Sequence, residues 1–305
     1  MKNLLIIDTP DNNWHTIFED EINAENIRLE QATWWNTYLT TYSDGAYVEL
    51  FPSAHDIVLP GQEKRRMIRP DFVLVRNLVE SFPPNYNYRN LLYGLMYANL
   101  PAMNSLHSIY MCLERPLVFG GLMEIKKRLG DSFPLIDQTY YSSYPQMIIT
   151  PDFPIVVKVG NAHAGMGKMR VSTNDDLDDL KSIIGLGNHY ITAEKFYETA
   201  EYDIRIKKIG NHYRAYKRTA FNWKRNVGGA LLEDIPIKAE YKLWADECSK
   251  LFGGLDMLAL DVVHLADGQD IIIELNDTAM GLNPEHKQED MTHMKELVLE
   301  KMKKL

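Results

Sequence analysis

The segment Leu255–Leu275 constrains the fold of this chain more than any other, because it places two carboxylates between aliphatic strands. Asp267-Gly268 is typical of a two-residue type I′ turn and predicts a β-hairpin. Pairing outward from that turn sets Asp261 directly opposite Glu274, with Asn276 two residues further along the same face. The neighbouring positions are largely aliphatic, so we expect this strand pair to be buried.

Facing carboxylates in a buried strand pair repel each other and are costly to desolvate, unless one is protonated or a cation bridges them. Oxygen-only ligands indicate Mg²⁺, Mn²⁺ or Ca²⁺ rather than zinc. A metal ion bound to phosphate is the simplest explanation for Asp261 and Glu274. The alternative is that one of the two carboxylates turns outward to water.

A second hairpin is predicted over Tyr202–Thr219, where Gly210-Asn211 suits a two-residue type II′ turn. Pairing outward gives facing pairs on one side of the strands: Asp203 with Arg218, Arg205 with Tyr216, and Lys207 with Arg214. Like charges opposite each other are unfavourable, so the last pair requires water or an anion nearby. A solvated polar face is the other interpretation of this pattern.

The segment Gly160–Lys168 is rich in glycine and has a lysine at each side, Lys158 and Lys168. Glycines let backbone N–H groups turn toward an anion. The segment is not a P-loop, because Gly165-Met166 stands where Gly-Lys is required and a strand follows where a helix should. A flexible flap over a triphosphate and an ordinary hairpin loop both fit. Further on, Thr192–Phe196 suits either an adenine-binding hinge or a plain strand.

The first hundred residues alternate strand and helix patterns. Apolar strands at Asn3–Asp8, Ile27–Gln31 and Asp71–Val75 precede an amphipathic helix at Tyr88–Leu100. This βαβ rhythm implies a parallel sheet with helices on its faces. From Asn104 onward, hairpins and helices follow each other. The predicted fold class is therefore α/β for residues 1–103, followed by α+β for residues 104–305.

Composition excludes several classes of protein. The 305 residues suffice for two or three lobes, and the net charge of −9 argues against a nucleic-acid-binding surface. No apolar run is long enough to span a bilayer, and the one at the N-terminus is too short for a signal peptide. Cys112 and Cys248 fall in apolar helical patterns, so reduced thiols and a cytoplasmic location are expected.

The order of these features along the chain resembles that of the ATP-grasp superfamily. A strand with Lys158 comes first, then the glycine-rich segment and the possible hinge. The hairpin with basic residues follows, and the hairpin with Asp261, Glu274 and Asn276 comes last. Within that superfamily, segments spread in order over nearly the whole chain resemble the synapsin family. These segments are Asn104–Ser108, Phe133–Thr139, His163–Lys168, Tyr202–Arg205, Asn222–Lys224 and Phe252–Asp256.

The resemblance implies a pre-ATP-grasp Rossmann-like domain at residues 1–103, then an ATP-grasp domain at residues 104–305 that holds ATP and a divalent cation between its lobes. The ATP-binding residues that it implies are Arg115, Lys158, Gly165, Gly167, Lys168, Glu194, Lys195, Phe196, Asp203 and Lys224. The implied catalytic residues, lining the triphosphate, are Arg218 and Asn226. The implied metal ligands are Asp261, Glu274 and Asn276.

Two functions remain open. Synapsins bind ATP, form dimers and tetramers, and associate with synaptic vesicles and actin in neurotransmitter secretion, which implies a regulatory protein that lies in the cytoplasm or peripherally on vesicles. The alternative is a ligase that activates a carboxylate as an acyl-phosphate for attack by an amine or a thiol. Asn276 stands where animal synapsins carry an aliphatic residue, and the Glu-x-Asn that it completes favours ligase chemistry. Arg115 stands where animal synapsins carry a lysine.

Overall fold

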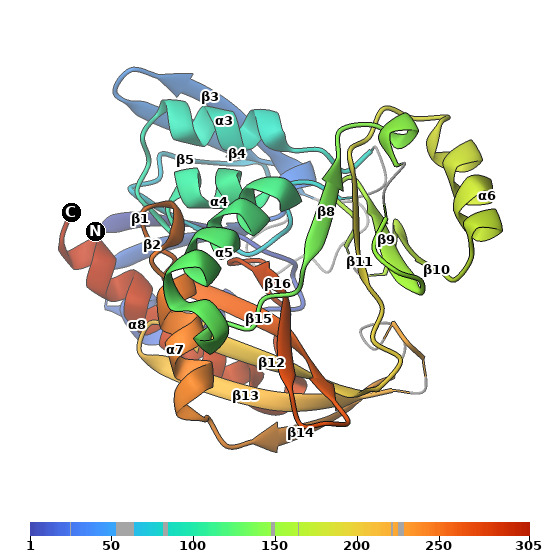
Figure 1. Cartoon of the computed structure of the whole chain (residues 1–305). Coiled ribbons are helices and arrows are strands. Elements are labelled where there is room, and N and C mark those ends of the chain that lie inside the picture. The colour runs from blue at the N-terminus through green and yellow to red at the C-terminus, as the bar shows by residue number, and fades with distance from the viewer. Residues whose placement is uncertain are drawn as a thin grey trace.

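The computed structural model describes residues 1–24, 26–52, 64–81, 85–147, 150–163, 165–220, 222–224 and 229–305. Their strands form four sheets, with helices packed between and around them (Figure 1). No helix in this part of the chain is long and apolar enough to cross a membrane.

The N-terminal region is built on a parallel sheet, as the βαβ rhythm predicts. Its strand order is β2-β1-β6-β7, and every neighbouring pair is parallel. The strands are β1 (Lys2–Ile7), β2 (Ile27–Ala32), β6 (Phe72–Val75) and β7 (Ala102–Met103). The helices of this region are α1 (Trp14–Ile17), α2 (Glu19–Asn23) and α3 (Arg89–Tyr97).

A second, antiparallel sheet in this region was not anticipated from the sequence. It has the order β3-β4-β5, with β3 at Thr37–Tyr42, β4 at Gly45–Leu50 and β5 at Arg66–Ile68. Every second residue of β4 is buried, starting from Ala46, and this period of two was present in the sequence.

Two helices connect the N-terminal region to the rest of the chain: α4 (Leu106–Cys112) and α5 (Arg115–Leu129). The Ser105 hydroxyl accepts the N–H of Ser108 at 3.1 Å, so Ser105 caps α4. Gly130 ends α5 with a φ of 58°, a conformation that glycine adopts at little cost. Short 3₁₀ turns occur at η1 (Trp34–Asn36), η2 (Gly130–Ser132), η3 (Tyr144–Gln146), η4 (Leu251–Gly253) and η5 (Pro284–His286).

A small lobe follows, with a four-stranded antiparallel sheet covered by one helix. The sheet order is β10-β9-β11-β8, and the helix is α6 (Asn174–Ile184). The strands are β8 (Gln138–Tyr141), β9 (Ile155–Val159), β10 (Lys168–Val171) and β11 (Ile191–Lys195).

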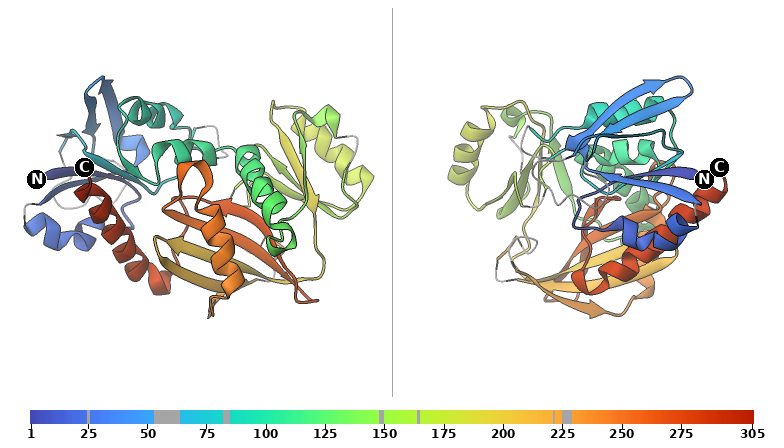
Figure 2. Two further views of the ribbon diagram at one scale, coloured as in Figure 1. Left: turned by 60° about the vertical axis from the view of Figure 1, so that its left-hand side comes forward. Right: turned by 180° about the vertical axis from the view of Figure 1, so that it is seen from behind.

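The large lobe contains a five-stranded sheet of order β14-β13-β12-β15-β16. The strands are β12 (Ala200–Ile209), β13 (His212–Thr219), β14 (Leu231–Ile235), β15 (Met257–Leu265) and β16 (Asp270–Asn276). Helices α7 (Ala239–Cys248) and α8 (Lys287–Lys303) pack on this sheet (Figure 2).

The alternation of side chains along β15 decides which helix each of its faces meets. Leu258 and Leu260 pack in one core with α5 and α7, whereas Met257 and Ala259 pack in another with α8. The core around α8 also contains side chains of β1, β2 and β6, so the end of the chain packs against its beginning. The two termini accordingly lie side by side (Figure 2).

The predicted strand registers are confirmed, although one turn is not of the predicted type. Gly210-Asn211 is a two-residue turn, and Gly210 has a φ of 56°. Between β15 and β16 the loop instead spans three residues, because His264 pairs with Asp270 and Leu265 donates to Gln269.

Only Gly268 in that loop has a positive φ, of 86°, whereas a type I′ turn needs two such residues. A bulge at Ile273 then restores the register, so Asp261 still faces Glu274. The predicted pair is therefore right, although the prediction of a type I′ turn at Asp267-Gly268 is wrong.

Candidate nucleotide site

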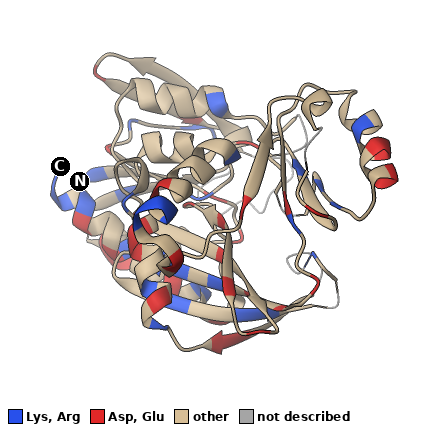
Figure 3. Ribbon diagram, in the orientation of Figure 1, with Lys and Arg blue, Asp and Glu red and all other residues tan. Residues whose placement is uncertain are grey.

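A cavity lies between the small-lobe sheet and the five-stranded sheet, and it brings together side chains from seven strands and from the segments that connect them. Most of the residues that the sequence singled out line it: Lys158, Lys168, Glu194, Lys195, Phe196, Asp203, Arg218, Lys224, Asp261 and Glu274. Acidic and basic residues therefore intermix on the elements around it (Figure 3).

The small-lobe wall of this cavity carries the two lysines that flank the glycine-rich segment. Lys158 on β9 and Lys168 on β10 are paired across the sheet, so both reach the cavity from one end of the hairpin. The Lys158 ammonium lies 2.5 Å from Glu194, and both side chains are almost fully buried. Burial lowers the pKa of Lys158, Glu194 acts in the opposite direction, and Arg115 and Lys168 lower it further.

The large-lobe wall carries the two carboxylates. Asp261 accepts from Arg205 Nη1 at 2.7 Å, and Arg218 Nη2 lies 3.3 Å from its other oxygen. Asn276 Nδ2 donates to Asp261 at 3.0 Å. Burial acts to raise the pKa of Asp261, but the two guanidinium groups outweigh it and hold this pKa below its ordinary value.

Basic side chains of the small lobe and of α5 neutralise the Glu274 carboxylate. Its two oxygens lie 3.2 Å from Lys168 Nζ and 3.2 Å from Arg115 Nη2. Burial acts to raise its pKa, but Lys168 and Arg115 hold it well below the ordinary value. The expected repulsion between Asp261 and Glu274 is therefore offset by basic side chains of the chain itself, which favour the ionised form of both acids.

The cations that neutralise these acids would meet the phosphates of a nucleotide in the same cavity. Lys158, Lys168 and Arg218 line the cavity with the acids. An anion placed among them would take over part of their pairing, which leaves carboxylate oxygens available to a hard cation. The arrangement is suited to bind a phosphate chain together with a divalent metal ion.

Comparison with known proteins gives the family. Residues 104–304 match the family model described as synapsin, ATP binding domain, and residues 1–102 match the synapsin pre-ATP-grasp domain. The chain belongs to the synapsin family. It is 35% identical to the synapsin of Drosophila melanogaster over 98% of its own length, but spans only 29% of that protein.

Solved ATP-grasp structures share the fold of this chain. The ATP-grasp ligase PsnB, complexed with a minimal precursor, has a TM-score of 0.64 at 14% identity, and 99% of each chain is covered. The macrocyclase MdnC of Microcystis aeruginosa, bound to the precursor peptide MdnA, has a TM-score of 0.64 at 14% identity over 98% and 99% of the two chains.

A RimK-domain ATP-grasp protein from Sphaerobacter thermophilus has a TM-score of 0.63 at 13% identity over 97% and 99%. Identities this low show the fold alone. The predicted fold class, a pre-ATP-grasp region followed by an ATP-grasp fold, is confirmed.

The segment that the synapsin resemblance implies as the adenine hinge lies at this cavity, with Glu194, Lys195 and Phe196 in its lining. The Glu194 side chain is bound to Lys158 and to Gln138, and the Phe196 N–H donates to the Pro154 carbonyl. Three aromatic side chains, Phe196, Tyr197 and Trp223, line the cavity beside them. Phe196 meets Trp223 edge to face, with ring centroids 5.9 Å apart.

The sequence did not assign Trp223 a role, although it belongs to one of the synapsin-like segments. Next to it, Lys224 Nζ donates to the Gly165 carbonyl at 2.8 Å, so the loop at 222–224 contacts the glycine-rich segment. Gly165 and Gly167 have φ of 82° and 67°, conformations that a side chain would strain. His163 hydrogen-bonds to Ser81, which connects the same segment to the N-terminal region.

Three further residues that the resemblance to synapsins implies are not among the described residues that line the first cavity. Arg115 and Asn276 line a second cavity, on the other side of Glu274, rather than the first. Asn226 lies outside the described residues. Arg205, which the sequence did not select, binds Asp261 more closely than Arg218 does. The signal was its register position, directly opposite Asp261 on β15.

The like-charged pair Lys207 and Arg214 does not reach the cavity. Lys207 Nζ lies 3.1 Å from Asp290, and Arg214 Nη2 lies 2.6 Å from Glu289, both on α8. The anion that the sequence required is therefore supplied by a helix of the same synapsin-type domain. The interpretation as a solvated face is wrong for Lys207, which is 1% exposed.

Proposed function

We propose that the chain binds ATP with a divalent cation in the cavity between its two lobes. One observation carries this proposal: Lys158 and Lys168 face Asp261 and Glu274 across a single cavity. Phosphates need cations, and a phosphate-bound metal needs carboxylates. The cavity offers both at opposite walls, and the ring of Phe196 offers a surface for a base.

The residue roles in this proposal are those that the resemblance to synapsins implies. Lys158, Lys168 and Arg115 would hold phosphates, and Lys224 would close the segment with Gly165 and Gly167 over them. Asp261, Glu274 and Asn276 would supply oxygens to Mg²⁺, Mn²⁺ or Ca²⁺. Arg218, with Asn226, would stabilise charge on the terminal phosphate. Glu194, Lys195, Phe196 and Asp203 would border the nucleoside.

A thermal-shift comparison tests this proposal. ATP with Mg²⁺ should raise the melting temperature, because a ligand that binds only the folded state stabilises it. Lys168→Met should abolish most of the shift, since Lys168 lines the cavity. Lys181→Met is the matched control, because Lys181 pairs with Asp178 on α6 of the same lobe and does not line the cavity. A wild-type melting temperature indifferent to millimolar ATP and Mg²⁺ would contradict the proposal.

For the role of the bound nucleotide, we propose regulation of self-association into dimers or tetramers and peripheral association with vesicles or actin. The support is the 35% identity with Drosophila synapsin over nearly the whole chain. Sedimentation with and without Mg·ATP, and flotation with lipid vesicles, test the two parts separately. A monomer at every nucleotide concentration would contradict the first part, and absence from floated vesicles would contradict the second.

A second candidate function is an ATP-dependent carboxylate–amine or carboxylate–thiol ligase. The observation that favours it is the second cavity, which begins at Glu274 and has Arg115 and Asn276 beside apolar side chains such as Phe119 and Leu122. A carboxylate held there would lie next to the nucleotide site. Its oxygen would take the γ-phosphoryl group and release ADP, and an amine or thiol would then displace phosphate.

Release of ADP in the presence of mixed organic acids and amines separates the two candidates. Stimulation by such a mixture supports the ligase. ADP release that no acid stimulates, together with intact ATP binding, supports the regulatory function.

A further inference from the structure

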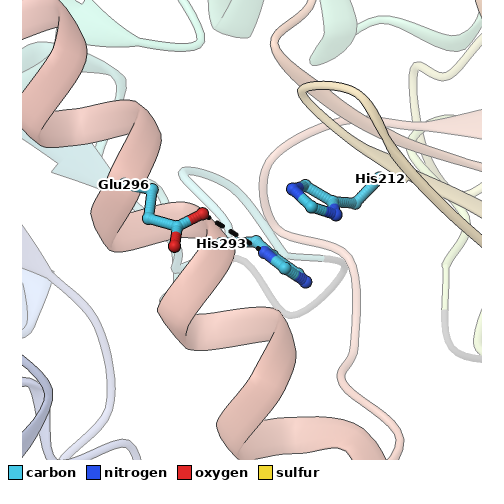
Figure 4. A group of neighbouring side chains, drawn as sticks. All are labelled: His212, His293 and Glu296. Carbon is cyan, nitrogen blue, oxygen red and sulfur yellow. Dashed lines mark hydrogen bonds and ion pairs between the residues drawn. The ribbon is translucent and has the colours of Figure 1, made fainter.

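A cluster of two histidines and a glutamate lies away from the nucleotide cavity, where the β12–β13 turn meets α8 (Figure 4). His212 begins β13, and His293 and Glu296 lie three residues apart on α8. The two imidazole rings are stacked, with centroids 3.4 Å apart. His293 Nδ1 lies 3.4 Å from Glu296 Oε2, and one candidate ligand atom from each residue falls within 4.8 Å of the others.

The backbone around this cluster is held in place by packing. Leu297 of α8 lies so close to Gly210 that a Cβ at that glycine would approach its side chain to 2.8 Å. On β12, three residues before Gly210, Lys207 is buried and paired with Asp290 of α8. The turn and the helix therefore have a fixed separation, which brings His212 to His293 without any ligand.

The donor set selects a class of metal ion. Imidazole nitrogens with one carboxylate are typical ligands of Zn²⁺ and its neighbours in the first transition row, whereas Mg²⁺ and Ca²⁺ prefer oxygen alone. Ligand atoms on one tetrahedral zinc ion lie about 3.3 Å apart, which is close to the 3.4 Å between His293 Nδ1 and Glu296 Oε2. His212 is exposed, so its ring can leave the stack and turn a nitrogen toward the ion.

We propose that His212, His293 and Glu296 bind one Zn²⁺ ion, with water in the remaining position. The ion would join the β12–β13 hairpin to α8, and α8 packs against the N-terminal sheet. Zinc would therefore stabilise the contact between this hairpin and α8. Glu289, whose carboxylate lies 3.8 Å from His293 Nε2, contributes negative charge nearby.

Equilibrium dialysis of the full chain against Zn²⁺, in millimolar Mg²⁺ that occupies oxygen-only sites, tests this proposal. We expect one zinc ion per wild-type chain. His212→Gln and His293→Gln should each lower the zinc affinity by about tenfold or more, and Glu296→Gln should lower it less. His189→Gln, at an exposed histidine of the small lobe, should bind zinc as the wild type does.

A second readout separates this site from the nucleotide cavity. Zinc should raise the melting temperature of the wild type and of Lys168→Met alike, but not that of His293→Gln. Circular dichroism verifies that each variant is folded, and the two histidine variants lie on different elements. Absence of stoichiometric zinc, or wild-type affinity in both histidine variants, would overturn the proposal.

Discussion

Two stretches of the same face of β12 carry the same kinds of charge and serve different ends. Toward the turn, Lys207 lies under α8, 1% exposed, and Asp290 neutralises it. Toward the other end, Asp203 lines the nucleotide cavity, and the buried Arg205 binds Asp261, which also lines it. The first group is closed by a helix, and the second opens onto a space between lobes. A charged strand face thus reveals a ligand site only where no element of the chain covers it.

The largest effect on the free energy of unfolding is expected at Lys207, where α8 covers β12. Lys207→Met leaves the Asp290 carboxylate buried without its main partner, which should lower the free energy of unfolding by about 3–5 kcal/mol. Affinity for Mg·ATP should stay within about twofold, because Lys207 does not line the cavity. Urea unfolding and calorimetry measure the two quantities. Lys127→Met, at an exposed lysine of α5, serves as the control. A marked loss of ATP affinity would break the distinction between the two ends.

A smaller stability effect is expected at the cavity. Glu274→Gln should lower the free energy of unfolding by about 1–2 kcal/mol, because Arg115 and Lys168 lose a charged partner but remain at a cavity wall. Urea unfolding of the ATP-free protein checks this value. A loss as large as that of Lys207→Met would mean that the cavity acids serve the fold in the same way as Asp290.

Acid sensitivity should sharpen the same contrast. The pKa values of Asp261 and Glu274 are depressed in the folded protein, so the stability they contribute is present above the ordinary carboxyl range and lost as pH falls through and below it. Unfolding free energy should therefore decrease between about pH 5 and about pH 3. The decrease should be shallower in Glu274→Gln. Parallel slopes in the two proteins would contradict the depressed pKa of Glu274.

The smallest effect on the free energy of unfolding is expected at Arg214, which lies beside α8 on β13. Arg214 pairs with Glu289, whose side chain is 58% exposed, and its Nε lies 3.6 Å from Asp290, which keeps Lys207 as its closer partner. Arg214→Ala should therefore change the free energy of unfolding by only about 0–1 kcal/mol. Urea unfolding at low and high salt is the measurement. A loss comparable with that of Lys207→Met would show that this pair belongs to the buried network.

The sequence predicted strand pairing well where a turn and an alternating face agreed, as for Asp203 with Arg218 and Asp261 with Glu274. The second pairing survived a wrong turn type, because the longer loop and the bulge at Ile273 offset each other. No local pattern reveals such a cancellation.

The partners of the charged residues were harder to predict. The cations around Glu274 come from α5 and β10, and the anions around Lys207 and Arg214 come from α8, 75 or more residues away in the chain. These contacts depend on how the lobes pack, which hydrophobic periodicity does not specify. The antiparallel sheet β3-β4-β5 differs in this respect, because the alternation of buried residues along β4 is a local pattern that indicates a strand.

The dependence of ATP affinity on Mg²⁺ tests most directly whether the cavity acids serve a nucleotide-bound cation. Calorimetric titration with ATP, in Mg²⁺ and in a chelator, gives a ratio of affinities for the wild type and for Glu274→Gln. In the wild type, Mg²⁺ should strengthen binding by about tenfold or more, equivalent to about 1.4 kcal/mol. In Glu274→Gln the ratio should fall toward one, because an anionic ligand of the cation is lost. Equal ratios in the two proteins would contradict a metal site at Asp261 and Glu274.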